Sequence, residues 1–305
     1  MRLKTLFSIF VFFSVPFIFA SNVSSSPAHH APSDLLLFEK CYPDVSFSKK
    51  WDEEKNDWKL FLSIPSKSEK KEDKTAVFYW ANGKMLPESE LSHKEKWWSL
   101  LYHYDKTLRD PANFSKEEIE RMRKFGSTQS RQEKAGSPMF FFDFLYDAWS
   151  EREIERHIVK TTFLGKNTKV HERIAPALSR VEKRILSKKD DEAVKSFIDT
   201  LTSADAYYWR QIAGTSRKSF HSYGIAIDVL PKRLYGKETY WNWAKEKRGE
   251  NWMLTPLNER WSPPQSVVEI FESEGFIWGG KWAVWDTMHF EYHPELIAWN
   301  KIAPR

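Results

Sequence analysis

Two short segments of this 305-residue chain carry the side chains best suited to chemistry. The first holds His221 and Asp228 with a glycine between them, and the second holds His289 with Asp286 three positions before it. Zinc in hydrolases commonly takes three protein ligands from histidine and carboxylate side chains and leaves a fourth position for water. His221, Asp228 and His289 would supply such a set of ligands.

The remaining carboxylate, Asp286, indicates that this set of ligands could form a catalytic site. A metal held by two imidazoles and one carboxylate keeps a positive charge, which lowers the pKa of a water molecule and polarises a carbonyl group. A carboxylate that does not bind the metal is then needed to take the proton of the water and pass it to the leaving amine. Spacing alone leaves the alternative open, because a histidine near an aspartate is also common as an ordinary surface or core pair.

The exact residue pattern of the two segments favours a metal site over an ordinary histidine–aspartate pair. Ser-x-His-x-x-Gly-x-Ala-x-Asp at 219–228, followed by Trp-Asp-x-x-His-Phe-Glu at 285–291, closely resembles the VanY-like D-alanyl-D-alanine carboxypeptidases. That zinc peptidase family also includes L-alanyl-D-glutamate endopeptidases. The resemblance extends from about Tyr207 to Tyr292 and implies a peptidase of bacterial cell-wall peptides with Zn²⁺ as its cofactor.

The resemblance also implies the roles of four residues: His221, Asp228 and His289 bind the zinc, and Asp286 is the catalytic base. All four are present, which argues against a non-catalytic, zinc-containing module that only binds the cell wall. Such a module stays as an alternative. A carboxypeptidase must recognise a free C-terminal carboxylate and an endopeptidase needs an open groove, and the sequence leaves both possible.

Three further residues are weaker candidates. Arg210 lies where similar sequences carry an arginine, and its guanidinium would grip a substrate carboxylate or stabilise the oxyanion, unless it is a surface residue. Ser219 shares strand parity with His221, so we expect it to contact the substrate or orient a ligand. Glu291 shares parity with His289 and would support a metal-bound imidazole or form an ordinary ion pair.

The pattern of the C-terminal half predicts an α+β fold. Helical spacing covers residues 172–200 with a break at 188–191, and a second helix is expected from Pro263 to Gly275. Alternating residues predict strands at 224–230 and 287–292. We therefore expect a small antiparallel sheet that carries the zinc site and is packed with helices.

The N-terminal half predicts an additional α/β extension. Residues 58–64 and 75–80 are rich in strand formers, and Asn-Gly at 82–83 is a turn signal. Residues 91–124 have a helical pattern, with a helix start at Ser115. The aromatic run at 140–149 is expected in the core.

The N-terminus predicts export. Arg2 and Lys4 precede an apolar run that ends near Ala20, as in a secretory signal peptide. The run is shorter than the roughly 20 residues of a membrane span, although an uncleaved anchor stays possible. We expect a signal peptide at 1–20, a flexible leader at 21–34, an N-terminal region of unknown role at 35–160 and the catalytic domain at 161–305.

The composition limits which disulfides, zinc ligands and partners are possible. Cys41 is the only cysteine, so an intrachain disulfide and a cysteine-rich zinc site are both impossible. The formal net charge of +5 fits a solvated lysine-rich surface as well as proximity to an anionic polymer. We expect peptidoglycan peptides as partners in the periplasm or outside the cell, no nucleic acid, and no stable membrane insertion after signal cleavage. The sequence predicts no oligomeric state.

Overall fold

The computed structural model of the protein describes residues 31–302, apart from positions 67, 69–70, 134–135, 213–214 and 216. The described part from Ala31 onward forms one compact unit. None of its helices combines the length and apolar character needed to cross a membrane. The expected signal peptide and most of the expected leader lie outside the described residues and stay predictions.

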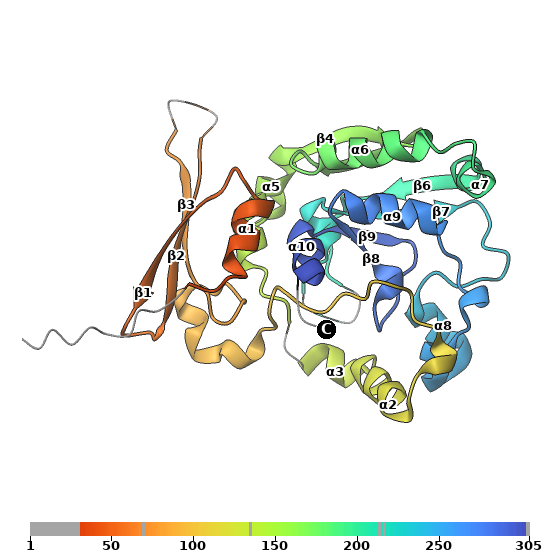
Figure 1. Ribbon diagram of the computed structural model, residues 1–305, viewed down its shortest axis with the longest axis horizontal. Helices are drawn as coiled ribbons and strands as arrows, with labels where there is room; N and C mark the ends of the chain where they lie inside the picture. The colour runs from red at the N-terminus through yellow and green to blue at the C-terminus, as the bar shows by residue number, and fades with distance from the viewer. Residues whose placement is uncertain are drawn as a thin grey trace, which may run out of the picture. The chain divides into compact units, whose positions relative to one another are not determined.

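Helices and three antiparallel sheets make up this unit (Figure 1). The helices are α1 (Leu35–Cys41), α2 (Lys116–Phe125), α3 (Thr128–Glu133), α4 (Phe140–Tyr146), α5 (Glu151–Ile154), α6 (Ala175–Leu186), α7 (Glu192–Thr200), α8 (Trp241–Arg248), α9 (Gln265–Ser273) and α10 (Pro294–Ile302). The strands are β1 (Ser46–Asp52), β2 (Asp57–Ile64), β3 (Lys74–Tyr79), β4 (Ile158–Phe163), β5 (Lys166–His171), β6 (Leu201–Asp205), β7 (Ala226–Pro231), β8 (Phe276–Trp278) and β9 (His289–Tyr292). The short 3-10 helices are η1 (Glu88–Lys96), η2 (Pro111–Asn113), η3 (Glu155–His157), η4 (Phe220–Tyr223), η5 (Gly249–Leu254), η6 (Leu257–Glu259) and η7 (Gly279–Lys281).

The N-terminal sheet has the strand order β1-β2-β3. Strands β2 and β3 confirm the two strands predicted there, and the Asn-Gly turn is confirmed by positive φ angles of 56° at Asn82 and 83° at Gly83. Strand β1 was not predicted, because five of its seven residues, Ser-Phe-Ser-Lys-Lys-Trp-Asp, are serine, lysine or aspartate and resemble a polar loop. Helix α1 packs against α10, which in turn contacts β8 (Figure 1).

The prediction of helix from 91 to 124 is only partly right. Helix α2 begins where expected, with Ser115 and Glu118 forming a capping box. Before it the chain forms η1 and then extends, because the backbone N–H of Trp98 donates to the carbonyl of Gly136 at 2.9 Å. Pro111 then opens the short 3-10 helix η2, capped by the side chain of Asp110. Pairing with a distant strand-like segment thus replaces a helix here.

The sheet of the C-terminal half has the order β6-β7-β9-β8, and all its neighbours are antiparallel. It confirms the small antiparallel sheet of the predicted α+β fold, and α6, α7 and α9 confirm the predicted helices. The hairpin β4–β5 was not predicted. It contains residue 160, so the expected domain boundary falls inside β4, and the division into domains stays a prediction.

A continuous hydrophobic core joins the two halves of the described part. It extends from Leu35 in α1 to Leu296 in α10 and includes the aromatic helix α4. Phe141, Phe142 and Phe144 are buried there, as the aromatic run predicted. Trp149, at the end of the same run, is 55% exposed and does not belong to the core.

Candidate metal centre and catalytic residues

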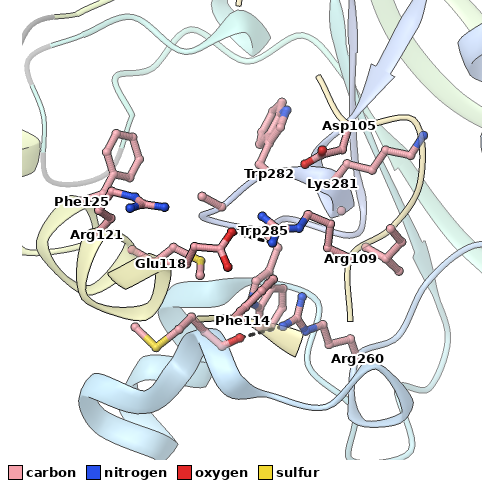
Figure 2. A pocket seen from close by; sticks show the side chains of 15 residues that line it. Asp105, Arg109, Phe114, Glu118, Arg121, Phe125, Arg260, Lys281, Trp282 and Trp285 are labelled. Atoms are coloured by element: carbon pink, nitrogen blue, oxygen red, sulfur yellow. Dashed lines mark hydrogen bonds and ion pairs between the residues drawn. The ribbon is translucent and has the colours of Figure 1, made fainter. Parts of the chain in front are cut away.

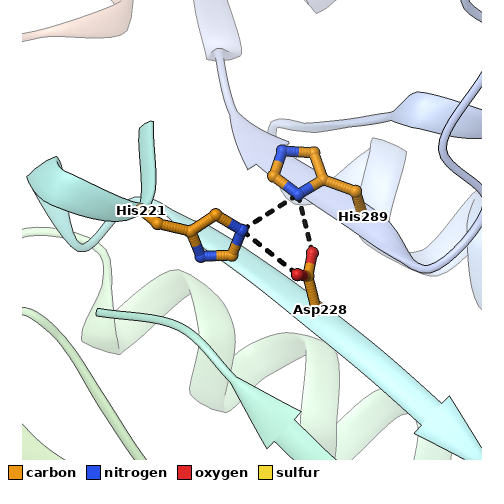
Figure 3. Close-up of side chains that lie close together, drawn as sticks. All are labelled: His221, Asp228 and His289. Carbon is orange, nitrogen blue, oxygen red and sulfur yellow. Dashed lines mark hydrogen bonds and ion pairs between the residues drawn. The ribbon is translucent and has the colours of Figure 1, made fainter. Parts of the chain in front are cut away.

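Three side chains converge on one face of the C-terminal sheet (Figure 3). Nδ1 of His289 lies 2.7 Å from Oδ1 of Asp228 and 3.2 Å from Nε2 of His221. Nε2 of His221 lies 3.3 Å from Oδ2 of Asp228. Each residue offers one ligand atom, and the three atoms lie within 4.8 Å of one another. The two imidazoles and the carboxylate are therefore close enough to share one metal ion.

The sheet brings two of these side chains together. Asp228 in β7 and His289 in β9 are direct cross-strand partners, and side chains opposite each other in such a pair lie on the same face of the sheet. The alternation of β7 buries Ile227 and Val229 in the core, which leaves Asp228 on the other face. The hydrophobic pattern of the strand thus determines where the carboxylate points.

A short turn brings the third side chain. His221 lies in the 3-10 helix η4, and Oγ of Ser219 caps this turn by accepting from the backbone N–H of His221 at 3.3 Å. Gly224 ends the turn at φ 63°, where a Cβ atom would lie 2.7 Å from the backbone nitrogen of His171. The glycine of the motif is thus required by both conformation and space.

Hydrogen bonds fix how the imidazoles are presented. Nδ1 of His221 donates to the carbonyl of Ala206 at 2.6 Å, so its Nε2 is free for the centre. Nε2 of His289 donates to Oε1 of Glu291 at 2.8 Å, which directs Nδ1 towards Asp228. The two free nitrogens thus face the same point, as ligands of a metal ion require.

The charges at this point also fit a cation. Burial disfavours a charge on His289, but Asp228 and Glu291 outweigh burial and raise the pKa of His289 well above its usual value. Burial likewise acts to raise the pKa of Asp228, yet His221 and His289 lower it below its usual range. The site therefore favours positive charge where the nitrogens converge, and a divalent cation would supply that charge.

Asp286 lies in the loop before β9, and its Oδ1 is buried without a hydrogen-bond partner among the described residues. Burial raises the pKa of Asp286 to about 7. Its backbone N–H donates to the carbonyl of Gly279 at 3.0 Å, and a Cβ on Gly279 would lie 2.5 Å from the Asp286 carbonyl. Asp286 therefore has an unoccupied carboxylate oxygen and a backbone position that depends on a glycine.

Behind the centre, a buried network supports His289. Glu291 accepts from His289 and its Oε2 lies 3.4 Å from Nε2 of His293. Nδ1 of His293 lies 2.8 Å from Oε1 of Glu295. His293 faces these two carboxylates and is outside the converging group, and Glu291 lies next to His289 as its strand parity predicted.

Two family models match parts of the chain. Residues 213–292 match a model described as D-alanyl-D-alanine carboxypeptidase. This stretch includes the three converging residues and Asp286, and it supports a peptidase of this zinc-dependent family. Residues 34–102 match a model described as a domain of unknown function. No curated protein and no solved structure matches the chain.

Two cavities reach the centre. A hairpin cavity of about 720 Å³ is bordered by His221 and Asp228 together with residues of β4 and β5, including Lys160 and Lys169. An aromatic cavity of about 370 Å³ is bordered by Asp228, Asp286 and His289 together with Trp241, Trp243 and Trp282. Arg210 is exposed and lines both cavities. The candidate metal site is thus accessible from two sides.

A third cavity of about 310 Å³ lies beside the aromatic cavity and shares Phe125 and Trp282 with it (Figure 2). One of its buried cations is Arg260, whose guanidinium donates to the carbonyls of Thr255 and Met253 and lies 4.5 Å from the ring centroid of Trp285. These contacts hold the residue that precedes Asp286. We therefore interpret Arg260 as structural support for the loop that carries the carboxylate.

The structure brings all seven sequence-predicted site residues to this region, although their roles stay predictions. Arg210 and Ser219 line the aromatic cavity, as does Glu291. The parity argument for Ser219 was wrong, because Ser219 caps a 3-10 turn and does not lie in a strand. Sequence reasoning missed the aromatic wall and two arginines, Arg131 and Arg217. Only Arg217 carried a signal, its place two residues before Ser219.

Proposed function

We propose that the protein is a zinc-dependent peptidase that hydrolyses peptidoglycan stem peptides, with D,D-carboxypeptidase activity as its main reaction. The observation that carries this proposal is the convergence of His221, Asp228 and His289 beside the buried carboxylate of Asp286. The match of residues 213–292 to a carboxypeptidase family supports the substrate class. Such a substrate implies a periplasmic or extracellular location, which agrees with the predicted signal peptide.

In this proposal Nε2 of His221, Nδ1 of His289 and the carboxylate of Asp228 hold the zinc ion. When bound, the ion would supply Lewis acidity, which would polarise a scissile carbonyl and lower the pKa of a water molecule beside it. Asp286 takes the proton of that water on its free oxygen and delivers it to the leaving nitrogen, so that the amide bond is replaced by a carboxylate and an amine. A pKa of about 7 suits a group that must both accept and donate a proton.

Supporting residues complete the proposed site. Arg210 lines both cavities, where its guanidinium would bind a substrate carboxylate or the developing oxyanion. Ser219 holds the turn of His221, and Glu291 holds the ring of His289. We assign these two residues to positioning the ligands: Ser219 fixes the backbone of His221, and the hydrogen bond to Glu291 leaves Nδ1 of His289 to face the metal.

A second activity, endopeptidase cleavage within the stem peptide, is favoured by one observation. Asp228 borders the hairpin cavity and the aromatic cavity, so a peptide bound across the centre would have space on both sides. A carboxypeptidase needs space for only one residue beyond the scissile bond. The two activities therefore predict different products from the same substrate.

Mass spectrometry of purified stem peptides, incubated with the protein in the presence and absence of a chelator, tests this function. Loss of one C-terminal D-alanine would establish the carboxypeptidase, and a shortened internal fragment the endopeptidase. The Asp286→Asn variant is the control. It should bind zinc like the wild type but lose about 100-fold or more in kcat. Full activity in this variant, or no chelator-sensitive product from the wild type, would refute the proposal and favour a non-catalytic module.

A further inference from the structure

Part of the wall of the aromatic cavity comes from a part of the chain outside the carboxypeptidase match. Trp98, in the extended segment before α2, and Arg131, in α3, line this cavity together with the metal-site residues. Residues 213–292 alone form the matched peptidase segment. The N-terminal part of the chain therefore contributes directly to the space in which a substrate would bind.

Arg217 projects into the same cavity from the loop before Ser219. Its guanidinium carbon lies 5.6 Å from the ring centroid of Trp98, and the backbone at Gly136 packs on its side chain so closely that a Cβ there would lie 2.9 Å from Cδ. Within the described part of the chain no acidic side chain forms an ion pair with Arg217. Its aliphatic part is held in place while its charge is not neutralised.

Arg131 adds a second guanidinium. Its central carbon lies 5.0 Å from the ring centroid of Trp241, on another aromatic wall of the cavity. Burial, and then the like charge of Arg131, lower the pKa of Arg217 below its usual value. Two guanidiniums that repel each other within one aromatic cavity would both be stabilised by an anion placed between them.

We propose that Arg217 and Arg131 form a carboxylate-binding subsite in the aromatic cavity, which selects peptides that carry a free carboxylate next to the scissile bond. A guanidinium recognises a carboxylate with charge-assisted hydrogen bonds, and the tryptophan rings exclude water and strengthen them. The inference rests on the proposed peptidase function. The carboxylate comes either from the C-terminus of the substrate or from an acidic side chain near the bond.

The substrate itself separates these two sources. A stem pentapeptide ending in D-alanyl-D-alanine is compared, as the free acid, with forms in which the C-terminal carboxylate or each side-chain carboxylate is replaced by a carboxamide. Isothermal titration calorimetry is carried out with zinc-loaded protein that carries Asp286→Asn, because the proposed activity would hydrolyse the free acid during the titration and this substitution should remove turnover while keeping the zinc. We expect this protein, which is wild type at the subsite, to bind the free acid about tenfold more tightly than one of these amides, as one charge-assisted hydrogen bond would provide. If only one of the amides binds more weakly than the free acid, the carboxylate replaced in that amide is the one that the subsite recognises.

Variants then assign the preference to the arginines. Arg217→Met keeps a packed aliphatic chain and removes the charge, so its affinities for the free acid and that amide should become equal. Arg217→Lys should retain part of the preference, and Arg131→Met should reduce it. Arg121→Met, an exposed arginine of the third cavity, is the matched control and should leave the preference unchanged.

The outcomes are distinct. An unchanged preference in Arg217→Met, or a wild type that binds every form equally or none, would overturn the subsite. A preference that depends on Arg217 without hydrolysis of any form would support the subsite and refute the peptidase function. Zinc content and thermal unfolding, measured on every variant, separate a lost charge from a lost fold.

Discussion

The hydroxyl of Tyr42 donates a hydrogen bond of 2.6 Å to Oε2 of Glu295, a buried contact between residues 253 positions apart in the chain. Glu295 is fully buried and contacts His293, which contacts Glu291, the partner of His289. The residue that ends α1 is thereby connected to a candidate metal ligand. The N-terminal part of the chain thus supports the back of the centre as well as one wall of its cavity.

Replacing Tyr42 with phenylalanine should therefore affect both stability and the metal. The variant leaves Glu295 with one hydrogen-bond partner fewer in a buried position, so the free energy of unfolding should fall by about 1.5–3 kcal/mol. Zinc affinity should also fall, by less than the roughly 10–100-fold that follows loss of a direct partner of a metal ligand. Chemical denaturation and competitive zinc titration measure these two effects.

Tyr104 offers a matched control. Its hydroxyl donates to Oε1 of Glu272 at 2.5 Å and accepts from the backbone N–H of Trp278 at 2.8 Å, and neither partner is a side chain of the network behind His289. Tyr104→Phe should lose at least as much free energy of unfolding as Tyr42→Phe and keep the zinc affinity of the wild type. Equal losses of zinc affinity in Tyr42→Phe and Tyr104→Phe would show that the network does not carry the effect.

The parts of the centre that were predictable from sequence depend on local patterns. The alternation of Ile227 and Val229 with Asp228 indicated a strand that turns its carboxylate away from the core. The parity of Glu291 with His289 likewise predicted the contact that the structure has. In both cases the deciding information lies within a few residues, where the geometry of a strand determines the direction of each side chain.

The features that the sequence did not predict depend on contacts between residues far apart in the chain or on weak local patterns. The extended segment at Trp98 pairs with Gly136, and nothing near Trp98 in sequence indicates that partner. The hairpin β4–β5 carries lysine, threonine and asparagine residues, so its alternation between core and solvent is weak. Arg131 belongs to no motif and reaches the cavity only through the packing of α3. The walls of the cavity were therefore hidden in the sequence.

Substitution of Gly279 by alanine should displace the loop that carries Asp286. The new Cβ would lie 2.5 Å from the carbonyl oxygen of Asp286 and 3.1 Å from the ring of Trp282, so the loop must shift. We expect a loss of about 1–3 kcal/mol in the free energy of unfolding and a fall in kcat, with zinc affinity nearly unchanged because no ligand is touched. Steady-state kinetics together with zinc titration test this. A variant that loses zinc but keeps kcat when saturated with metal would contradict it.

Removal of the metal should lower stability in the wild type. A ligand that binds only the folded state stabilises it by about 4 kcal/mol at 1,000 times its dissociation constant, so a chelator should lower Tm and added zinc should restore it. Differential scanning fluorimetry measures this shift. His289→Ala should remove the response to zinc, whereas Asp286→Asn should keep it. A chelator response that persists in His289→Ala would place the zinc elsewhere.

The buried histidine of β5, His171, should make stability depend on pH. Its Nε2 donates to the carbonyl of Tyr146 at 3.2 Å, and its Nδ1 accepts from the backbone N–H of Arg173 at 3.1 Å. Both nitrogens are therefore satisfied in the neutral ring. Burial, followed by the charges of His157 and Arg173, lowers the pKa of His171 from 6.5 to about 3.

Because this pKa is lowered in the folded state, the stabilisation is complete above pH 6.5. This stabilisation is lost as the pH falls from 6.5 towards 3, because in this range His171 binds a proton in the unfolded chain but stays neutral in the folded protein. The free energy of unfolding should decrease by up to about 1.4 kcal/mol per pH unit through this group. His171→Gln should be less stable at pH 7 and lose this part of the slope, so the difference between variant and wild type should shrink on acidification. Urea denaturation at a series of pH values measures it, and a difference that stays constant from pH 7 to 4 would show that His171 titrates normally.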